Sequence, residues 1–561
     1  MIPVPDLLHA EPSKKPDDRH LLELLEIAFL GRNEGREIDL AVAQTPPLDS
    51  TWTPEFFADD LFLDDFIQRL RIITVAGDPY PMHTPFLKRV LSQPPNDIET
   101  VRLRQAILRE LDSDPTILES MEDLYRQLVY LLDLFKTAHT QTLIDTATHR
   151  LDTLRQVLKV IHQMDKAFEG SRSGLRRLHE TALQIQKSRE YETLTALLEH
   201  EDNRASIDLQ VRIGADGRIR NLVIKEFEAN DDNQFYRTPL WRWLDLVRLR
   251  WNGLTSNSRE MVNRLIHKIY LQIAPSLSTL MQVLGHLEVY LMSRAFARAV
   301  RANGLEVCLA EVVEEGRLIL RQVFNPLLLG QNSAPVPCDI SPDCDDAVVV
   351  VTGPNSGGKT RLLQALGLAQ VLGQSGLYTP AREAQLRIAR GTFASLVHQD
   401  AADLSEGRLG TELIRIRTLF HGVGSRSMIL LDELCSGTNP SEAAEIVAIV
   451  LRLARKLSPV AFVTTHFLDL ARHLEDDPPI ERMEFLQVEI DDHDQSTYQF
   501  VPGVATTSLA LGTANRLGVS FEGLSALIDE RLEEEAALGT EPNTGITVSA
   551  KPVSETLSTT E

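Results

Sequence analysis

The sequence has few cysteines, few aromatic residues and no long apolar run. Its 561 residues include four cysteines, and aromatic residues make up 6% of the chain. So few cysteines imply no disulfide framework. No run of about 18 or more uncharged apolar residues occurs, and the first 15 residues lack the apolar core of a signal peptide. We therefore expect a cytoplasmic protein with no membrane partner.

Two of the cysteines, Cys338 and Cys344, flank a stretch rich in proline and aspartate. A pair of thiols at this spacing could suggest a metal site. No second ligand pair follows at the spacing of a zinc site, so an ordinary surface loop is the favoured interpretation.

The sequence contains fewer basic than acidic residues. Lysine and arginine number 57 against 80 aspartate and glutamate residues, which gives a formal net charge of −23. Broad, non-specific binding to nucleic acid depends on neutralising phosphates with basic side chains, so this composition argues against it. A local basic surface within an acidic chain remains compatible with the composition.

The chain is too long for a single core and is expected to form two to four domains. Residues 1–60 are rich in proline, with one helix predicted at His20–Leu30. Residues 61–304 carry apolar residues at helical spacing, which predicts a helical core or lever domain. Residues 305–532 change to an α/β pattern, and residues 533–561 have the composition of a disordered tail.

Alternating apolar residues interrupt the helical pattern near residues 207–227. Residues 214–217 supply the turn sequence Gly-Ala-Asp-Gly between two alternating runs, which predicts a small β-hairpin. Long helices are expected to resume from Met261 to Ala302, with an interruption at Pro275.

Short apolar strands alternate with helical segments in the second half. The strands are predicted at Ala347–Val351, Met428–Leu431 and Val460–Val463. Such alternation is typical of a largely parallel sheet with helices on its faces. The predicted fold is therefore a multidomain chain: a helical core with a β-hairpin, followed by an α/β P-loop NTPase domain.

A phosphate-binding loop follows the first of these strands, and a helix is predicted behind it at Leu362–Leu372. The glycines let backbone N–H groups face phosphates, and the helix adds its positive N-terminal end. We expect Lys359 to reach the β- and γ-phosphates of ATP and the Thr360 hydroxyl to bind Mg²⁺. The predicted nucleotide-binding residues are Gly353, Pro354, Asn355, Ser356, Gly357, Gly358, Lys359 and Thr360.

Two further strands end in polar residues of the kind that hydrolyse ATP. Met428–Leu431 runs into Asp432 and Glu433, and the strand after it runs into His466. Asp432 is expected to hold Mg²⁺, and Glu433 to act as the general base on the attacking water. His466 is expected to sense the γ-phosphate. Alone, each pattern fits a strand that ends in a charged turn, but together with the P-loop they predict an ATPase site.

Four motifs in order resemble those of the MutS family of DNA mismatch-repair ATPases. TGPNSGGKT at 352–360 resembles the family's TGPNMGGKST, and QSGLYTPA at 374–381 looks like QIGSFVPA. LDELCSGT at 431–438 is similar to MDEIGRGT, and TTHF at 464–467 to ATHY. The resemblance extends more weakly over most of residues 60–530.

The resemblance implies an ATPase that forms a homodimer, in which a signature loop from one subunit completes the ATP site of the other. The matching loop here is DLSEGRLGT at 403–411, against the family's DLASGRSTF. Glu406 stands where the family has a phosphate-contacting serine, so Ser405 and Arg408 are the candidates for this contact. Residues Ser508–Arg531 resemble the terminal helices that stabilise the dimer.

The resemblance also implies a divergent member of the family. The residues before Leu61 are too few for the family's mismatch-reading and connector domains, and they contain no Phe-x-Glu wedge. Trp52, Phe56 and Phe57 near the start of the chain are better interpreted as core residues.

Three functions are compatible with the sequence. In the first, an ATP-switched clamp binds double-stranded or branched DNA through cations of the hairpin, although a solvated hairpin is equally compatible. The second is an ABC-type mechanical ATPase that acts on a ribosome or another protein, but the LSGGQ signature of that class is missing. The third, a catalytically silent relative, is disfavoured by the intact site residues. The hairpin cations are Arg212, Arg218, Arg220 and Lys225.

Overall fold

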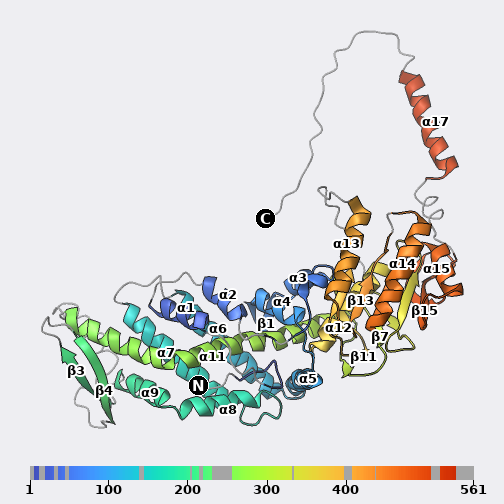
Figure 1. Ribbon diagram of the computed structural model, residues 1–561. Coiled ribbons are helices and arrows are strands. Elements are labelled where there is room, and N and C mark those ends of the chain that lie inside the picture. The colour runs from blue at the N-terminus through green and yellow to red at the C-terminus, as the bar shows by residue number, and fades with distance from the viewer. Residues whose placement is uncertain are drawn as a thin grey trace, which may run out of the picture.

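The computed structural model describes most of the chain, and an elongated helical part and an α/β part make up the molecule (Figure 1). The described residues are 5–11, 19–30, 36–44, 48, 50–137, 145–201, 205–213, 219–229, 256–330, 334–396, 407–435, 438–493, 495–506 and 519–538.

The helical part confirms the helical pattern that the sequence predicts. In α5, for example, the Asp97 side chain caps the helix by accepting from the Thr100 N–H at 2.7 Å, and Ile107, Leu108 and Leu111 are buried along one face. The predicted N-terminal helix is confirmed as α1, whereas α2 was not predicted. The helices are α1 (Arg19–Phe29), α2 (Arg36–Gln44), α3 (Leu63–Arg69), α4 (Thr84–Ser92), α5 (Ile98–Ser113), α6 (Pro115–Thr137), α7 (Asp145–Ala167), α8 (Arg176–Gln186) and α9 (Arg189–Glu201).

Two β-hairpins accompany these helices. The hairpin of β3 (Ala205–Ile213) and β4 (Ile219–Ala229) confirms the predicted one and lies at the end of the molecule far from the α/β part (Figure 1). The hairpin of β1 (Ile72–Val75) and β2 (Asp78–Pro81) was not predicted. Its two-residue turn places Ala76 and Gly77 at positive φ, the geometry that a tight hairpin requires.

Helix α11 (Ser256–Ala302) connects the hairpin end to the α/β part. It runs for 47 residues, or about 70 Å at 1.5 Å per residue, and Pro275 lies inside it. The predicted interruption at Pro275 is therefore wrong. From Ser276 to Ser293 every residue is buried, because α4, α6, α7 and other elements surround the helix. This packing outweighs the backbone hydrogen bond that a proline removes.

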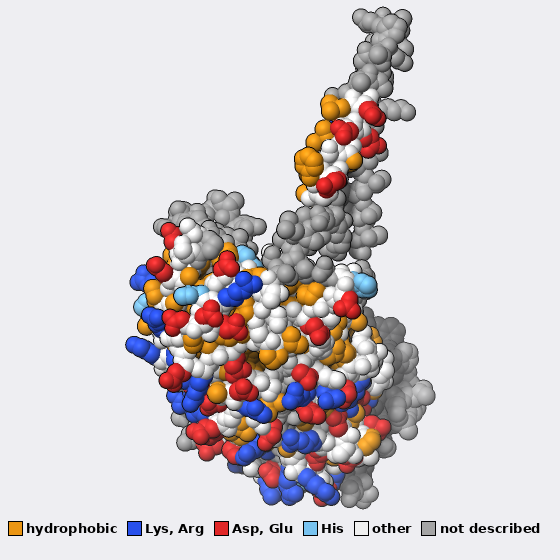
Figure 2. Space-filling model, turned by 90° about the vertical axis from the view of Figure 1, so that its right-hand side faces the viewer, with side chains coloured by type: hydrophobic (Ala, Val, Ile, Leu, Met, Phe, Trp, Pro, Cys, Tyr) orange, Lys and Arg blue, Asp and Glu red, His pale blue; other side chains and the backbone are white. Residues whose placement is uncertain are grey.

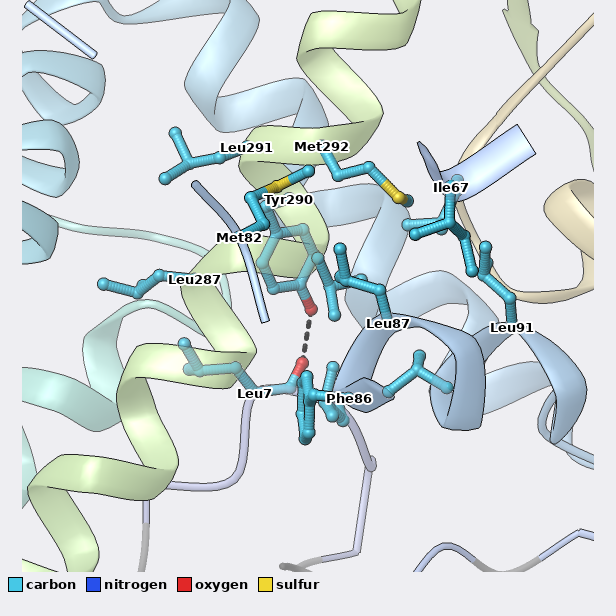
Figure 3. Close-up of a cluster of buried hydrophobic side chains, with 14 of the residues drawn as sticks. Leu7, Ile67, Met82, Phe86, Leu87, Leu91, Leu287, Tyr290, Leu291 and Met292 are labelled. Carbon is cyan, nitrogen blue, oxygen red and sulfur yellow. Dashed lines mark hydrogen bonds between the residues drawn. The ribbon is translucent and has the colours of Figure 1, made fainter. Parts of the chain in front are cut away.

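The N-terminal strap, residues 5–11, packs against the helical part with residues 5–8 buried in its core, and the sequence did not predict this. Leu7 is fully buried; its N–H donates to His286 Nδ1 at 3.4 Å, and its carbonyl accepts from the Tyr290 hydroxyl. Figure 3 shows Leu7 beside Phe86 and opposite Tyr290. Side chains of α11 thus satisfy both backbone polar groups of a buried residue.

The buried Arg104 of α5 joins the strap to the α/β part. Its Nε donates to the Leu8 carbonyl at 2.9 Å, and its NH1 donates to the Ser375 carbonyl at 3.0 Å. Ser375 is the C-cap of α12, so a positive charge lies at the negative end of that helix.

A buried charge cluster fastens α4 to α11. The ring of His83 lies 2.8 Å from Glu288 and 3.2 Å from Asp39, and the Tyr125 hydroxyl donates to Glu288 at 3.1 Å. Burial alone would lower the pKa of His83, but the two carboxylates outweigh it and raise that pKa to about 10.

The α/β part is built on a six-stranded sheet, which confirms the predicted parallel arrangement. The order is β12-β13-β14-β9-β15-β16; the first five strands are parallel, and β16 is antiparallel to β15. The strands are β9 (Val348–Thr352), β12 (Thr392–Ser395), β13 (Met428–Leu431), β14 (Val460–Thr465), β15 (Met483–Ile490) and β16 (Ser496–Pro502).

Helices cover both faces of this sheet. On one face lies α12 (Lys359–Gln374), which also contacts strands of a smaller four-stranded sheet. The other face carries α13 (Gly407–Gly422), α14 (Pro440–Ala454) and α15 (Leu468–Asp476). The remaining elements are β5 (Cys308–Leu309), β6 (Glu311–Val313), β7 (Ile319–Val323), β8 (Cys338–Ile340), β10 (Tyr378–Thr379), β11 (Glu383–Arg387), η1 (Pro54–Phe56), η3 (Pro326–Leu328) and η4 (Arg455–Leu457).

One hydrophobic core runs through both parts of the molecule. It contains Leu7 of the strap, Tyr290 of α11 and Val349 of the central sheet. Trp52 and Phe57 are buried in the same core, as expected of them. The predicted boundary near residue 305 is therefore not a break in the packing.

Helix α17 (Phe521–Leu538) stands apart from the rest of the molecule (Figure 1). It continues past Glu533, where the disordered tail was expected to start; residues 539–561 lie outside the described residues. Its apolar side chains form an exposed stripe (Figure 2). Among the described residues, no helix combines the length and apolar character needed to cross a membrane.

Candidate nucleotide site

The phosphate loop connects β9 to α12 as predicted, and two of its glycines are required by geometry. Gly358 has φ +86° at the start of α12, and Gly353 has φ +139°. A Cβ on Gly353 would lie 2.7 Å from the Val488 side chain of β15, which packs beneath the loop. A larger residue fits at neither position. The tip residues Asn355 and Ser356 are exposed to solvent.

Lys359 is held under the loop, with its side chain 3% exposed. Its ammonium group donates to the carbonyls of Gly353 at 2.9 Å and Pro354 at 3.0 Å, and lies 3.8 Å from Glu433 Oε1. Burial lowers the pKa of Lys359, and the carboxylates of Glu433 and Asp432 oppose that shift. A cation at this position can bind phosphate oxygens that reach the loop.

Asp432 lies at the end of β13 between two hydroxyl groups. Thr360 Oγ1 donates to its Oδ2, and Thr464 Oγ1 donates to its Oδ1, both at 2.5 Å. Burial raises the pKa of Asp432, while the two hydroxyl donors act in the opposite direction.

The pair of Thr360 and Asp432 fits Mg²⁺. Both supply hard oxygen ligands, and Mg²⁺ is usually held by one or two protein oxygens together with substrate phosphates and water. Within the described ranges no cluster of three or more His, Cys, Asp or Glu residues could hold a metal by itself. Cys338 is buried in β8, and burial raises the pKa of its thiol to about 12.

Glu433 lies in a strained turn directly after β13. Its φ is +49°, and Cys435 two residues later has φ +63°. The Glu433 N–H donates to Thr464 Oγ1 at 2.9 Å, and its Oε2 lies 3.5 Å from Nδ1 of His466, which is 31% exposed. The turn aims the carboxylate back across the end of the sheet, toward Lys359 and His466.

Five predicted site residues therefore come together in space. They lie at or near the carboxyl ends of β9, β13 and β14, which are neighbours in the sheet. Such an edge is where parallel sheets bind ligands. The five are Lys359, Thr360, Asp432, Glu433 and His466.

The structure does not test the predicted contact between the ATP site and a partner subunit's signature loop. Ser405 lies outside the described residues. Arg408 falls in the first turn of α13, and the structure does not describe its side chain. Both residues stay predictions.

Sequence reasoning missed a pocket beside the loop. It has a volume of about 130 Å³, and its lining includes Gly358, Val336, and Tyr498 and Phe500 of β16. The Tyr498 ring lies 3.1 Å from the position of a Cβ on Gly358. Alternating residues of β16 were a signal for a strand, but no local pattern says that it packs against the phosphate loop.

Comparison with known proteins agrees with this geometry. Residues 349–524 match the family model for MutS domain V. Over these residues the chain is similar to the MutS family. The match begins in β9 and ends in α17, so it includes the five converging residues.

Curated relatives in this family carry the name Endonuclease MutS2. The protein from Ligilactobacillus salivarius is 31% identical over 267 residues, which cover 46% of this chain and 33% of the relative. The protein from Streptococcus equi subsp. equi is 31% identical over 273 residues, covering 48% of this chain and 33% of the relative. The chain thus spans about a third of the length of these relatives. The comparisons give no support to the ABC-type alternative.

Proposed function

We propose that this chain is a member of the MutS family and a Mg²⁺-dependent ATPase that uses ATP to switch a dimeric, DNA-binding clamp. The observation that carries the proposal is the convergence of the five site residues at one edge of the central sheet. The match to MutS domain V and the MutS2 relatives support it. The name of those relatives includes endonuclease, but the proposal for this chain is confined to ATP and DNA.

Hydrolysis of ATP depends mainly on positioning and charge stabilisation. Lys359 binds the β- and γ-phosphate oxygens, and Glu433 accepts a proton from the attacking water at a carboxylate oxygen. His466, 3.5 Å from Glu433, donates to a γ-phosphate oxygen. Thr360 and Asp432 hold Mg²⁺, which when bound neutralises charge on the phosphates.

The pocket beside Gly358 is the proposed place for the adenine base. Tyr498 and Phe500 offer aromatic surface on which a flat base can stack, and the amide of Asn325 and the guanidinium of Arg361 are among the few polar groups that line it. A base there would be next to the loop that binds its phosphates.

The apolar stripe of α17 supports a homodimer. Exposed leucine and isoleucine side chains recur three or four residues apart, so they share one face of the helix. A second copy of this chain covers that face, and Ser405 and Arg408 of each copy reach the ATP of the other. The stripe consists of Phe521, Leu524, Leu527, Ile528 and Leu532, which are 44–85% exposed.

The hairpin of β3 and β4 is the proposed DNA contact. Its strand pairing shifts register twice, and the shifts leave Arg220 and Lys225 without a cross-strand partner. Such bulges bend a strand and increase its local twist. Arg212 pairs with Asn221, and Arg218 lies outside the described residues. Helix α11 joins this hairpin to the ATPase part, which makes it the proposed lever.

Two measurements test the two halves of the proposal. Purified protein is assayed for phosphate release from ATP with and without Mg²⁺, beside a Lys359→Met variant, which is expected to lose activity. Filter retention of homoduplex, mismatched and branched DNA is followed from about 50 to 200 mM salt, where electrostatic binding weakens steeply. Absence of hydrolysis refutes the ATPase half, and absence of retention even at low salt refutes the DNA half.

A further inference from the structure

The turn that carries Glu433 adopts a conformation that its own residues disfavour. Glu433 and Cys435 are not glycine, yet both have φ in the left-handed region. A Cβ crowds the backbone there, so the surrounding structure must hold such residues in place. The contacts that hold this turn therefore decide where the Glu433 carboxylate points.

Three backbone N–H groups of the turn are anchored from three different elements. Asp432 N–H donates to the Ser395 carbonyl of β12 at 3.0 Å, and Glu433 N–H donates to Thr464 of β14 at 2.9 Å. Cys435 N–H donates to the Glu412 carboxylate of α13 at 3.0 Å. The third acceptor is a carboxylate, and charge-assisted hydrogen bonds are stronger than neutral ones.

The part of α13 that carries Glu412 is itself fixed. Three residues further on, Arg415 donates to the carboxylate of Asp60 and, at 3.2 Å, to the carbonyl of Ala394 in β12. Leu419, one turn beyond, is fully buried in the second core of the α/β part. Glu412 thus projects toward the turn from a supported helix and lines the same small cavity as Asp432.

We propose that Glu412 is a positioning residue for hydrolysis: by accepting the Cys435 N–H, it fixes the turn that presents Glu433 to the attacking water. This inference rests on the proposed ATPase function. Because α13 begins within the predicted signature loop, the position of that helix then controls the general base of the same chain.

Substitutions at Glu412 separate this role from simple structural support. Glu412→Ala removes the acceptor and is expected to lower the single-turnover hydrolysis rate by about 10- to 100-fold, the size of effect that a misplaced group produces. ATP affinity stays within about twofold, because Lys359 and the loop are untouched. Glu412→Gln keeps an oxygen acceptor and restores most of the rate. Glu445→Ala, at an exposed acid on α14, is the matched control and leaves the rate unchanged.

A double-mutant cycle with Glu433→Gln tests whether Glu412 affects the hydrolysis rate through Glu433. If Glu412 acts through Glu433, adding Glu412→Ala to Glu433→Gln lowers the residual rate no further. An equal fall in both backgrounds overturns the inference. So does a loss of rate that tracks a lower melting temperature and that Glu412→Gln does not restore. If Glu412→Ala does not fold, Glu412→Asp, which is one methylene shorter, serves in its place.

The outcomes also separate this inference from the proposed function. A wild-type chain that does not hydrolyse ATP, or a Glu433→Gln variant as active as wild type, refutes the proposed site itself. A wild-type chain that needs Glu433 but keeps its full rate after Glu412→Ala refutes the positioning role alone.

Discussion

Replacing Glu433 by glutamine tests the assignment of the general base with little change in shape. The substitution exchanges one carboxylate oxygen for an amide nitrogen and removes one negative charge. In the structure that charge lies 3.8 Å from the Lys359 ammonium and 3.5 Å from His466 Nδ1. Unit charges about 4 Å apart attract by roughly 4 kcal/mol at an effective dielectric constant of 20. Exposure of the side chain reduces this to a fraction of that value.

We expect the substitution to preserve or strengthen ATP binding but to slow ATP hydrolysis. Without the carboxylate, Lys359 is freer to bind phosphate and no negative charge faces the γ-phosphate, so ATP binding is retained or tightened. Without a proton acceptor, the rate of hydrolysis falls by about 10² to 10⁴-fold, the usual contribution of a general base. Each factor of ten corresponds to about 1.4 kcal/mol of activation free energy, so the loss amounts to roughly 3–6 kcal/mol.

Equilibrium titration with ATP, single-turnover hydrolysis and sedimentation of the ATP-bound protein measure these effects separately. We expect Glu433→Gln to bind ATP, to leave it intact and to accumulate as a dimer. Glu445→Gln makes the same chemical change at an exposed position on α14 and is expected to behave as wild type. Hydrolysis by Glu433→Gln at the unmodified rate would refute the reasoning.

Four further predictions address the rest of the molecule. Leu7→Ala, at a fully buried position, is expected to lower the free energy of unfolding by about 2–5 kcal/mol in urea denaturation; an unchanged midpoint would show that the strap adds nothing to stability. Replacing Arg220 and Lys225 together by alanine is expected to weaken DNA binding and to reduce the slope of log affinity against log salt by about two, whereas an unchanged slope would exclude them as phosphate contacts. Ile528→Asp on α17 is expected to shift sedimentation toward the monomer, and an unaltered dimer would place the interface elsewhere. Because the folded pKa of His83 is raised to about 10, its contribution to stability is fully present below about pH 6.5 and is lost as pH rises toward 10; a His83→Leu variant with the same loss would contradict this.

The sequence was sufficient for the features that depend on local patterns. A strand followed by a glycine loop and a helix identified the phosphate site, because the required order is continuous in the chain. Asp432 and His466 could be placed near that site because parallel strands share an edge for their carboxyl ends. The β3–β4 hairpin was predictable from alternation and turn residues alone.

Features that depend on contacts between distant residues could not be predicted. Tyr498 approaches Gly358 only because β16 pairs at the edge of the sheet next to the loop. Helix α11 passes Pro275 without a break because neighbouring helices surround it, and no spacing in its own sequence shows this. The Glu412 contact with Cys435 likewise joins a helix to a turn 23 residues away.

The N-terminal strap has a consequence for how the chain is made. His286 and Tyr290, which bind the Leu7 backbone, lie in α11, and His286 follows Leu7 by 279 residues. At roughly 5–20 residues per second, translation of that interval takes about 15 to 60 s. During this time α11, which buries the strap, has not yet been made. The leucines of the strap are therefore open to contact with other apolar surfaces. The helical part therefore closes around the strap only after α11 has been synthesised, so the strap is packed long after it emerges from the ribosome.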